Sequence, residues 1–213
     1  MIIWIVFHIF VIQMKIIGLS GKSGSGKTTL LNAIREKFTP EEVCILSLDN
    51  YYKKRTKQQK DGKGYYNFDL MSSFDWDKVV SNLKQLIAGK EVRKKRYTFN
   101  NEARASYLTL RPAQIVVIEG IFIFSHPEIW KLLDYSIIIE APDQLCRQRR
   151  LLRDLKDRNY KEEEILHRFN NHFLPAYRDL VEPFKSKVNL VLYNEEELEI
   201  ARKVLLGKVA SFL

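Results

Sequence analysis

The stretch GKSGSGKTTL, which begins at Gly21, constrains the fold of this chain more than any other feature. Gly21, four further residues and then Gly26-Lys27-Thr28 match the pattern G-x-x-x-x-G-K-S/T, between an apolar run and a helical pattern. That context is typical of a phosphate-binding loop, because its backbone N–H groups converge on phosphate oxygens and the helix N-terminus adds the positive end of its dipole. The chain is therefore expected to bind a nucleotide where a strand meets a helix.

Side chains of this loop have separate expected roles. Lys27 supplies a cation to the β- and γ-phosphates, and Thr28 offers its hydroxyl to Mg²⁺. ATP or GTP with Mg²⁺ is therefore the expected cofactor. The residues predicted to contact the nucleotide are Gly21, Lys22, Ser23, Gly24, Ser25, Gly26, Lys27, Thr28 and Thr29.

Apolar runs and helical patterns alternate along the rest of the chain. Continuous β-branched runs suit strands that are buried on both faces, and their alternation with helices predicts βαβ units. The fold class is therefore α/β, a P-loop NTPase three-layer sandwich with a parallel sheet. The expected strands are 15–20, 43–48, 115–120, 136–140 and 188–193, and the expected helices are 28–38, 75–88, 143–158, 161–180 and 195–212.

A polar interval, 50–112, interrupts this alternation. It holds one expected helix and a hairpin around EVRKKRYTF, and an interval of this length favours an inserted lobe that binds the acceptor over a structureless loop. The domain expectation is thus a kinase domain over 14–213 with this lobe and an arginine-rich lid over 143–160. Residues 1–13 form an apolar extension.

The composition fits one soluble globular domain, since 46% of the 213 residues are hydrophobic and 29% are charged. A formal charge of +9 suits a polyanionic ligand: nucleotide phosphates, nucleic acid or a membrane surface. Basic residues concentrate in the lid and the hairpin, and no nucleic-acid-binding motif is present, so no nucleic acid is expected.

Neither the cysteines nor the histidines suggest a metal site. Cys44 and Cys146 are far apart, which excludes a CxxC pair and favours a cytoplasmic setting. His167 and His172 alone come near a metal-ligand spacing, but they lack the HExxH pattern, so a surface or helix-packing role is expected for all four histidines.

The N-terminal segment MIIWIVFHIFVIQ is shorter than the roughly 20 residues of a membrane span. It also lacks the charge and cleavage pattern of a signal peptide. An extra strand, a weakly membrane-associating segment and an extension upstream of a start at Met14 stay open, and no stable membrane insertion is expected.

Two carboxylates lie at the carboxyl ends of expected strands and therefore at the edge of the sheet that carries the phosphate loop. Asp49 follows the second strand, where it can accept a proton from an attacking hydroxyl, although a turn or cap role is the alternative. Glu119 ends the third strand, where it can hold the metal or its waters, although it could also simply face solvent.

The segment CRQRRLLRDLKDR contains several arginines that could clamp a transferring phosphoryl group. A charge run is more often a solvated helix face, so only Arg153, Arg158 and then Arg150 are predicted to act. A GTPase is not indicated, because the guanine-reading N-K-x-D stretch is absent.

Several motifs together resemble the uridine kinase family, within the phosphoribulokinase/uridine kinase group of P-loop kinases. They are GLSGKSGSGKTT, LSLDNYY, YNFDLMSSFDWD, LIAGKEV, RYTFNNEAR, IVVIEGIF, RDLKDR and LPAYRDLVEP, in the order of the family over 15–193. The resemblance implies phosphorylation of the 5′-hydroxyl of a nucleoside. Related kinases for nicotinamide riboside, pantothenate or a sugar phosphate remain alternatives, as does a non-catalytic nucleotide-binding regulator.

The resemblance also implies residue roles. Asp49 would be the catalytic base and Glu119 the metal-linked carboxylate. Arg153 and Arg158 would act in the lid. On the acceptor side, Tyr52 would lie beside the acceptor, Asp69 would bind the ribose hydroxyls, and Tyr97 and Phe99 would border the base. The alternatives are a turn role for Asp69 and hairpin packing for the two aromatic residues.

Four positions on the base side depart from motifs of the family, the first of which is Y-D-F-x-x-H-x-R. Thr98 and Glu102 replace its aspartate and histidine, while Arg104 is kept; Tyr160 replaces the last arginine of E-R-G-R, and Arg168 replaces a glutamine. Glu102 could read an amino-bearing or cationic ring, or it could pair with Arg168. The acceptor, the preferred donor and a homo-oligomeric state stay open.

Overall fold

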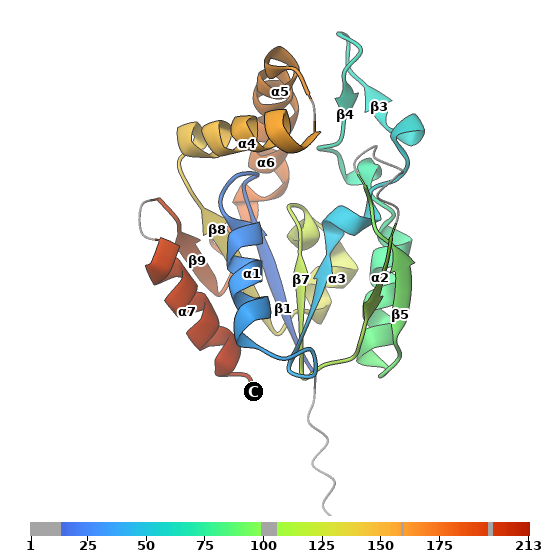
Figure 1. Ribbon diagram of the computed structural model, residues 1–213, viewed down its shortest axis with the longest axis vertical. Helices are drawn as coiled ribbons and strands as arrows, with labels where there is room; N and C mark the ends of the chain where they lie inside the picture. The colour runs from blue at the N-terminus through green and yellow to red at the C-terminus, as the bar shows by residue number, and fades with distance from the viewer. Residues whose placement is uncertain (1–13, 99–105, 159, 196–197) are drawn as a thin grey trace, which may run out of the picture.

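The computed structural model describes residues 14–98, 106–158, 160–195 and 198–213. Its centre is a five-stranded parallel sheet with the strand order β2-β7-β1-β8-β9 (Figure 1). The strands are β1 (Lys15–Gly21), β2 (Val43–Ser47), β7 (Ile115–Glu119), β8 (Tyr135–Glu140) and β9 (Leu190–Tyr193). All five expected strands are present, and the predicted α/β fold is confirmed.

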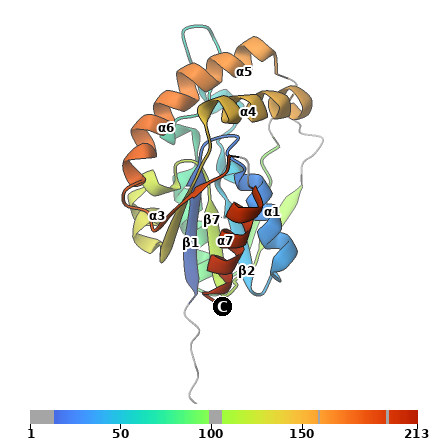
Figure 2. The same ribbon diagram turned by 90° about the vertical axis from the view of Figure 1, so that its left-hand side faces the viewer.

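Helices cover both faces of this sheet, as Figures 1 and 2 show. Alternate residues of β1 point to opposite faces, so Ile17 packs with α1 and α7 while Ile16 packs with α2 and α3. Two separate apolar clusters therefore sandwich the sheet, which is why its strands are apolar throughout. The helices are α1 (Lys27–Lys37), α2 (Trp76–Ile87), α3 (Pro127–Leu132), α4 (Asp143–Arg158), α5 (Glu162–Arg168), α6 (Leu174–Leu180) and α7 (Leu198–Ala210).

Two features differ from the sequence expectation. The helix expected over 161–180 contains a π-helical turn, Phe169–Phe173, between α5 and α6, and α3 was not predicted because it is a single short stretch. The helix expected from 75 begins where the Asp75 carboxylate accepts the N–H of Lys78 at 3.3 Å, as an N-cap does.

Between β2 and β7 the chain leaves the main sheet and forms two small antiparallel pairs. The pair of β3 (Gln59–Lys60) with β4 (Tyr66–Asn67) was not predicted, whereas β5 (Val92–Lys95) with β6 (Tyr107–Leu110) is the hairpin expected near EVRKKRYTF. The connecting segments also contain short 3₁₀ turns, at Leu48–Tyr51, Arg55–Lys57, Met71–Ser73, Ile123–Ser125 and Glu182–Phe184.

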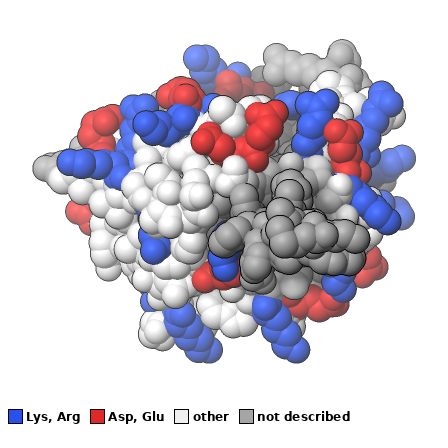
Figure 3. Space-filling view, turned by 90° about the horizontal axis from the view of Figure 1, so that it is seen from below, with Lys and Arg blue, Asp and Glu red and all other residues white. Residues whose placement is uncertain are grey.

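The surface near the amino ends of the strands carries both signs of charge. Figure 3 shows acidic and basic side chains interspersed around the edge of this face, with uncharged residues between them. Within the described ranges, none of the helices combines the length and the hydropathy that a membrane crossing needs. The apolar extension 1–13 lies outside the described residues.

Candidate active site

A cavity of about 340 Å³ opens at the carboxyl ends of the parallel strands. Its walls come from the phosphate loop, the end of β7, the segment after β2, α4, and both flanks of α5, with Tyr160 before that helix and Arg168 at its end. The lining residues are Ser23, Gly24, Gly26, Lys27, Thr28, Thr29, Asp49, Tyr52, Phe68, Asp69, Tyr97, Glu119, Ile121, Arg149, Arg150, Arg153, Asp154, Arg158, Tyr160 and Arg168.

Most of the predicted site residues therefore meet in one place. Of the predicted loop residues, Gly21, Lys22 and Ser25 do not line the cavity. Phe99, Glu102 and Arg104 lie outside the described residues, so the two hypotheses for Glu102 remain predictions.

The phosphate loop needs glycine at two positions because other segments of the same chain approach its backbone closely. Gly24 and Gly26 have φ values of 87° and 97°, which other residues rarely adopt. A Cβ at Gly24 would meet the carbonyl oxygen of Cys146 at 2.4 Å, and one at Gly26 would meet the side chain of Asn194 at 2.2 Å. The Asn194 amide also donates to the Ser25 carbonyl at 2.7 Å, so the end of β9 holds the loop.

Lys27 and Lys22 lie in the same loop but point to different places. Nζ of Lys27 donates to the carbonyls of Gly21 and Lys22 at 2.8 and 2.9 Å beside the cavity. Burial lowers the pKa of Lys27, although the charges of Glu119 and Asp49 oppose this shift.

Lys22 instead connects the loop to the end of β8 and the start of α4. Its Nζ lies 2.6 Å from Asp143 and 3.4 Å from Glu140. Burial alone would lower the pKa of Lys22, but the hydrogen bond to Asp143 and the charge of Glu140 raise it. Lys22 is thus placed to support the loop rather than to reach into the cavity.

Two carboxylates stand at adjacent strand ends. Glu119 pairs in register with Leu19 of β1 and Ser47 of β2, and the Ser47 hydroxyl donates to its Oε2 at 2.8 Å. Burial raises the pKa of Glu119 to about 7, and the neighbouring charge of Asp49 adds to this. Asp49 itself is exposed.

The donor set at this edge fits Mg²⁺. The hydroxyl of Thr28 and the carboxylate of Glu119 both line the cavity, and hard oxygen donors are what Mg²⁺ prefers. A buried carboxylate with a raised pKa is also a group that a bound cation would keep ionised.

Three arginines of α4 surround one buried carboxylate. Asp154 is 3% exposed and lies 3.5 Å from Arg150, 2.8 Å from Arg153 and 3.4 Å from Arg158. Burial would raise the pKa of Asp154, but the arginine charges outweigh this and lower it. Asp154 therefore orients the arginines that line the cavity.

We expect Asp154→Asn to destabilise the fold by about 2–3 kcal/mol at neutral pH. Removing one partner of a buried ion pair costs roughly 3–5 kcal/mol. We expect about 2–3 kcal/mol here, because the arginines keep some contact with water, which screens their charges. Because the pKa of Asp154 is lowered in the folded state, this stabilisation is lost in the wild type as pH falls. Urea unfolding measures the effect, and the exposed Asp157→Asn on the same helix is the control. Equal stability of both variants would contradict it.

The opposite end of the cavity is aromatic. The ring of Tyr52 lies 5.3 Å from Tyr97 and 5.7 Å from Phe68, measured between centroids. Asp69, which directly follows Phe68, is buried and lies 3.6 Å from Arg150. Flat aromatic faces beside a buried carboxylate suit a ligand with a ring and hydroxyl groups.

Two of the positions that depart from the family pattern meet at this end. The guanidinium of Arg168 lies 4.5 Å from the centre of the Tyr160 ring and 5.5 Å from that of Phe68. Arg168 also forms an ion pair with Glu164 at 2.7 Å. The replacements at 160 and 168 thus contact each other as a cation on an aromatic face.

A sequence model of the phosphoribulokinase/uridine kinase family matches residues 16–201, nearly the whole chain. The chain belongs to this family. A uridine-cytidine kinase A of Dictyostelium discoideum is 31% identical over 195 residues, which is 91% of this chain but 39% of that protein. A uridine kinase of Bacillus cereus strain AH187 is 28% identical over 199 residues and is covered over 94% of its length.

Solved structures share the fold of this family member. A structure described as a possible uridine kinase from Bacillus stearothermophilus superposes with a TM-score of 0.58 at 21% identity, covering 84% of this chain and 88% of the other. A D-glycerate 3-kinase of Cryptococcus neoformans superposes with a TM-score of 0.54 at 15% identity, over 78% of each chain. At these identities the likeness concerns the fold.

Several residues that line the cavity or hold its side chains and loop in place were not among the predicted site residues. Asp154 lies four residues from both Arg150 and Arg158, a spacing that predicts helical ion pairs and could have indicated it. Phe68 and Ile121 lie within the quoted motifs YNFDLMSSFDWD and IVVIEGIF, and Arg149 lies within the arginine run. Asn194 has no such local signal, because its contact with the loop spans the fold.

Proposed function

We propose that this chain is a nucleoside kinase that transfers the γ-phosphoryl group of ATP or GTP to the 5′-hydroxyl of uridine or cytidine. Family membership and the uridine kinases among its relatives support this activity. The observation that carries the proposal is that one cavity joins the phosphate loop, a strand-end aspartate, an arginine cluster and an aromatic end.

At the donor end, the loop N–H groups and Lys27 would hold the phosphates of the nucleotide. Thr28 and Glu119 would hold Mg²⁺, which when bound neutralises charge on the phosphate oxygens. Arg153 and Arg158 line the same cavity and would offset the charge that develops on the transferred group.

Between the two ends, Asp49 would act as the general base. Its carboxylate would accept the proton of the 5′-hydroxyl as that oxygen attacks the γ-phosphorus and the bond to the leaving nucleoside diphosphate breaks. Its exposure towards the cavity is compatible with direct contact with the acceptor.

At the acceptor end, Asp69 would accept hydrogen bonds from the ribose hydroxyls, with Arg150 fixing its orientation at 3.6 Å. Tyr52 would lie beside the acceptor, and Tyr97 and Phe99 would border the base. Glu102 and Arg104 remain our predicted base-side contacts, and Arg168 with Tyr160 would form part of the same wall.

An acceptor panel tests this function. ATP consumption is measured with uridine, cytidine, nicotinamide riboside, pantothenate and a sugar phosphate at equal concentrations. We expect a pyrimidine nucleoside to give the highest kcat/KM. Turnover only with one of the other alcohols would assign the chain to a related kinase activity, and salt-sensitive RNA binding without turnover would indicate a regulator.

The raised pKa of Glu119 predicts the pH dependence of this reaction. Glu119 must be ionised to hold a cation, so kcat/KM should fall below about pH 7, by up to tenfold per pH unit. Ser47→Ala removes a hydrogen bond that favours the ionised form, so it should move the break to higher pH. Activity measured from pH 5.5 to 8.5 checks both points, and a flat wild-type profile below pH 7 would refute them.

A further inference from the structure

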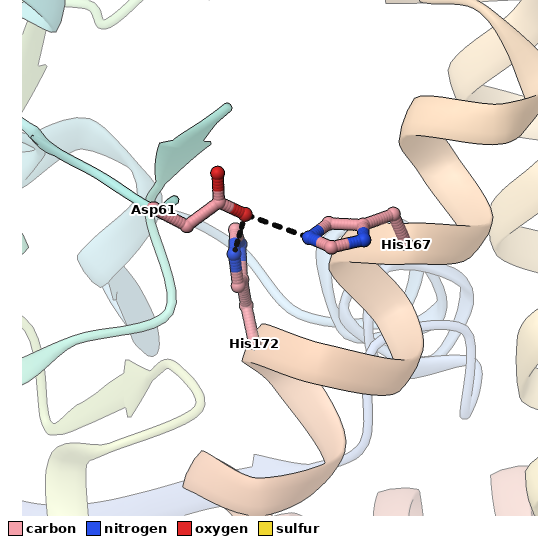
Figure 4. Close-up of side chains that lie close together, drawn as sticks. All are labelled: Asp61, His167 and His172. Carbon is pink, nitrogen blue, oxygen red and sulfur yellow. Dashed lines mark hydrogen bonds and ion pairs between the residues drawn. The ribbon is translucent and has the colours of Figure 1, made fainter. Parts of the chain in front are cut away.

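Three side chains converge on the far side of α5, outside the proposed reaction. Nε2 of His167 lies 2.7 Å from Oδ2 of Asp61, and Nε2 of His172 lies 2.8 Å from the same oxygen (Figure 4). The potential ligand atoms of the three residues all lie within 4.8 Å of one another. We refer to Asp61, His167 and His172 as the histidine cluster.

The π-helical turn is what brings the two histidines together. Residues five apart on a regular α-helix point roughly 140° away from each other, because the helix turns about 100° per residue. In the π turn, the N–H of Leu174 donates to the carbonyl of Phe169, five residues earlier. His167 and His172 therefore share one side of the helix, as Figure 4 shows. A π turn costs regular hydrogen bonding and often marks a functional position.

The carboxylate is held in place from the other side. Oδ1 of Asp61 accepts the backbone N–H groups of Lys63 and Tyr65, each at 2.9 Å, in the turn between β3 and β4. This leaves Oδ2 directed at the two imidazoles. The side chain of His172 is only 4% exposed, so the cluster is partly enclosed and its groups are positioned before any ligand arrives.

We propose that the histidine cluster is a binding site for a divalent transition metal, of which Zn²⁺ is the representative. Two imidazole nitrogens and one carboxylate oxygen, completed by water, form a common tetrahedral ligand set at 2.0–2.2 Å. Such ligands lie about 3.3 Å apart, so the two Nε2–Oδ2 separations of 2.7 and 2.8 Å would lengthen by roughly half an ångström as the metal replaces the hydrogen bonds. Imidazole ligands favour Zn²⁺ over Mg²⁺ or Ca²⁺, so the site differs chemically from the oxygen donors beside the phosphate loop.

Metal binding requires a change of tautomer. The Asn171 amide donates to Nδ1 of His167 at 3.2 Å and to the His167 carbonyl at 2.9 Å, so Nε2 carries the proton and donates to Asp61. A metal on Nε2 moves this proton to Nδ1, and the exposed Asn171 then turns its amide oxygen towards Nδ1–H. Imidazole protonation competes with the metal, so binding weakens as pH falls.

A bound metal would link two walls of the active-site cavity. Asp61 belongs to the β3–β4 turn, which leads into the cavity residues Phe68 and Asp69, while His167 precedes the cavity residue Arg168. Occupancy would hold these walls together without touching the proposed phosphoryl-transfer groups.

Calorimetric titration with Zn²⁺, on the full chain treated with chelator and free of nucleotide, tests the site. We expect one Zn²⁺ per chain, and at least about 10-fold weaker binding for both Asp61→Asn and His167→Gln, since even partners of metal ligands contribute 10–100-fold. Asp61→Asn keeps the size of the side chain and one oxygen acceptor but removes the charge, and its NH2 group must face either the imidazoles or the N–H groups of Lys63 and Tyr65. His167→Gln therefore serves as the second, independent variant. His126→Gln is the matched control, because His126 stacks on Trp76 instead.

Two further measurements distinguish loss of the metal site from misfolding of a variant and from zinc binding at another site. Zn²⁺ should raise the unfolding midpoint of the wild type and of His126→Gln, but not that of Asp61→Asn. Binding that survives both cluster variants but is lost in Glu119→Gln would place zinc beside the phosphate loop and overturn the proposal. An absence of Zn²⁺ binding by the folded wild type would also overturn it and leave the cluster as a hydrogen-bonded link.

Discussion

Asp49→Asn is expected to lower kcat by about 10²–10⁴-fold, the range that a positioned general base contributes. The amide keeps the size and the polarity of the side chain but cannot take the proton of the attacking hydroxyl. Because Asp49 is exposed at a strand end, we expect no large change in stability. Steady-state kinetics with the best acceptor measures the effect.

The matched control is Asp77→Asn, on the exposed face of α2 and outside the cavity lining. It makes the same chemical change without touching the site, so its kcat should equal that of the wild type. A fully active Asp49→Asn enzyme would show that this carboxylate is not the base and would leave Asp49 with a turn role.

Lys27→Met should lower kcat/KM for the nucleotide by at least about 10²-fold, the loss typical when one group that stabilises transition-state charge is removed. The same change should leave the unfolding midpoint unchanged or higher in the absence of nucleotide. Burial lowers the pKa of Lys27, so the charged ammonium group destabilises the folded protein at neutral pH. Methionine carries no charge, so it removes this destabilisation.

Lys22→Met in the same loop should have the opposite effect on stability. The pKa of Lys22 is raised in the folded state, so its stabilisation is fully present at neutral pH and disappears only when the pH rises through that pKa. Its replacement should therefore lower the unfolding midpoint. Calorimetry on both variants tests the contrast, and a fall in the midpoint of Lys27→Met would contradict our account of its burial.

Local sequence patterns were sufficient to predict the sheet and the residues at the nucleotide-binding end of the cavity. The apolar runs predicted all five strands, because strands buried between two helical layers must be apolar along their whole length. Parallel order then brings the loop after β1, Asp49 after β2 and Glu119 on β7 to one edge. These site residues could be predicted from the sequence, because a residue at the carboxyl end of a parallel strand must lie at that edge of the sheet.

Tertiary contacts decided the remainder. Sequence spacing did not separate Lys22 from Lys27, because the carboxylates that hold Lys22 away from the cavity are distant in the sequence. They are Glu140 at the end of β8 and Asp143 at the start of α4. Similarly, the sequence predicted a surface or helix-packing role for two histidines five residues apart, and the π turn with the distant Asp61 brought them together. The sequence by itself determined the strands and the phosphate loop, because these depend on local hydrophobicity and backbone freedom. Only the folded chain decided which charged groups meet, because those contacts join segments more than a hundred residues apart.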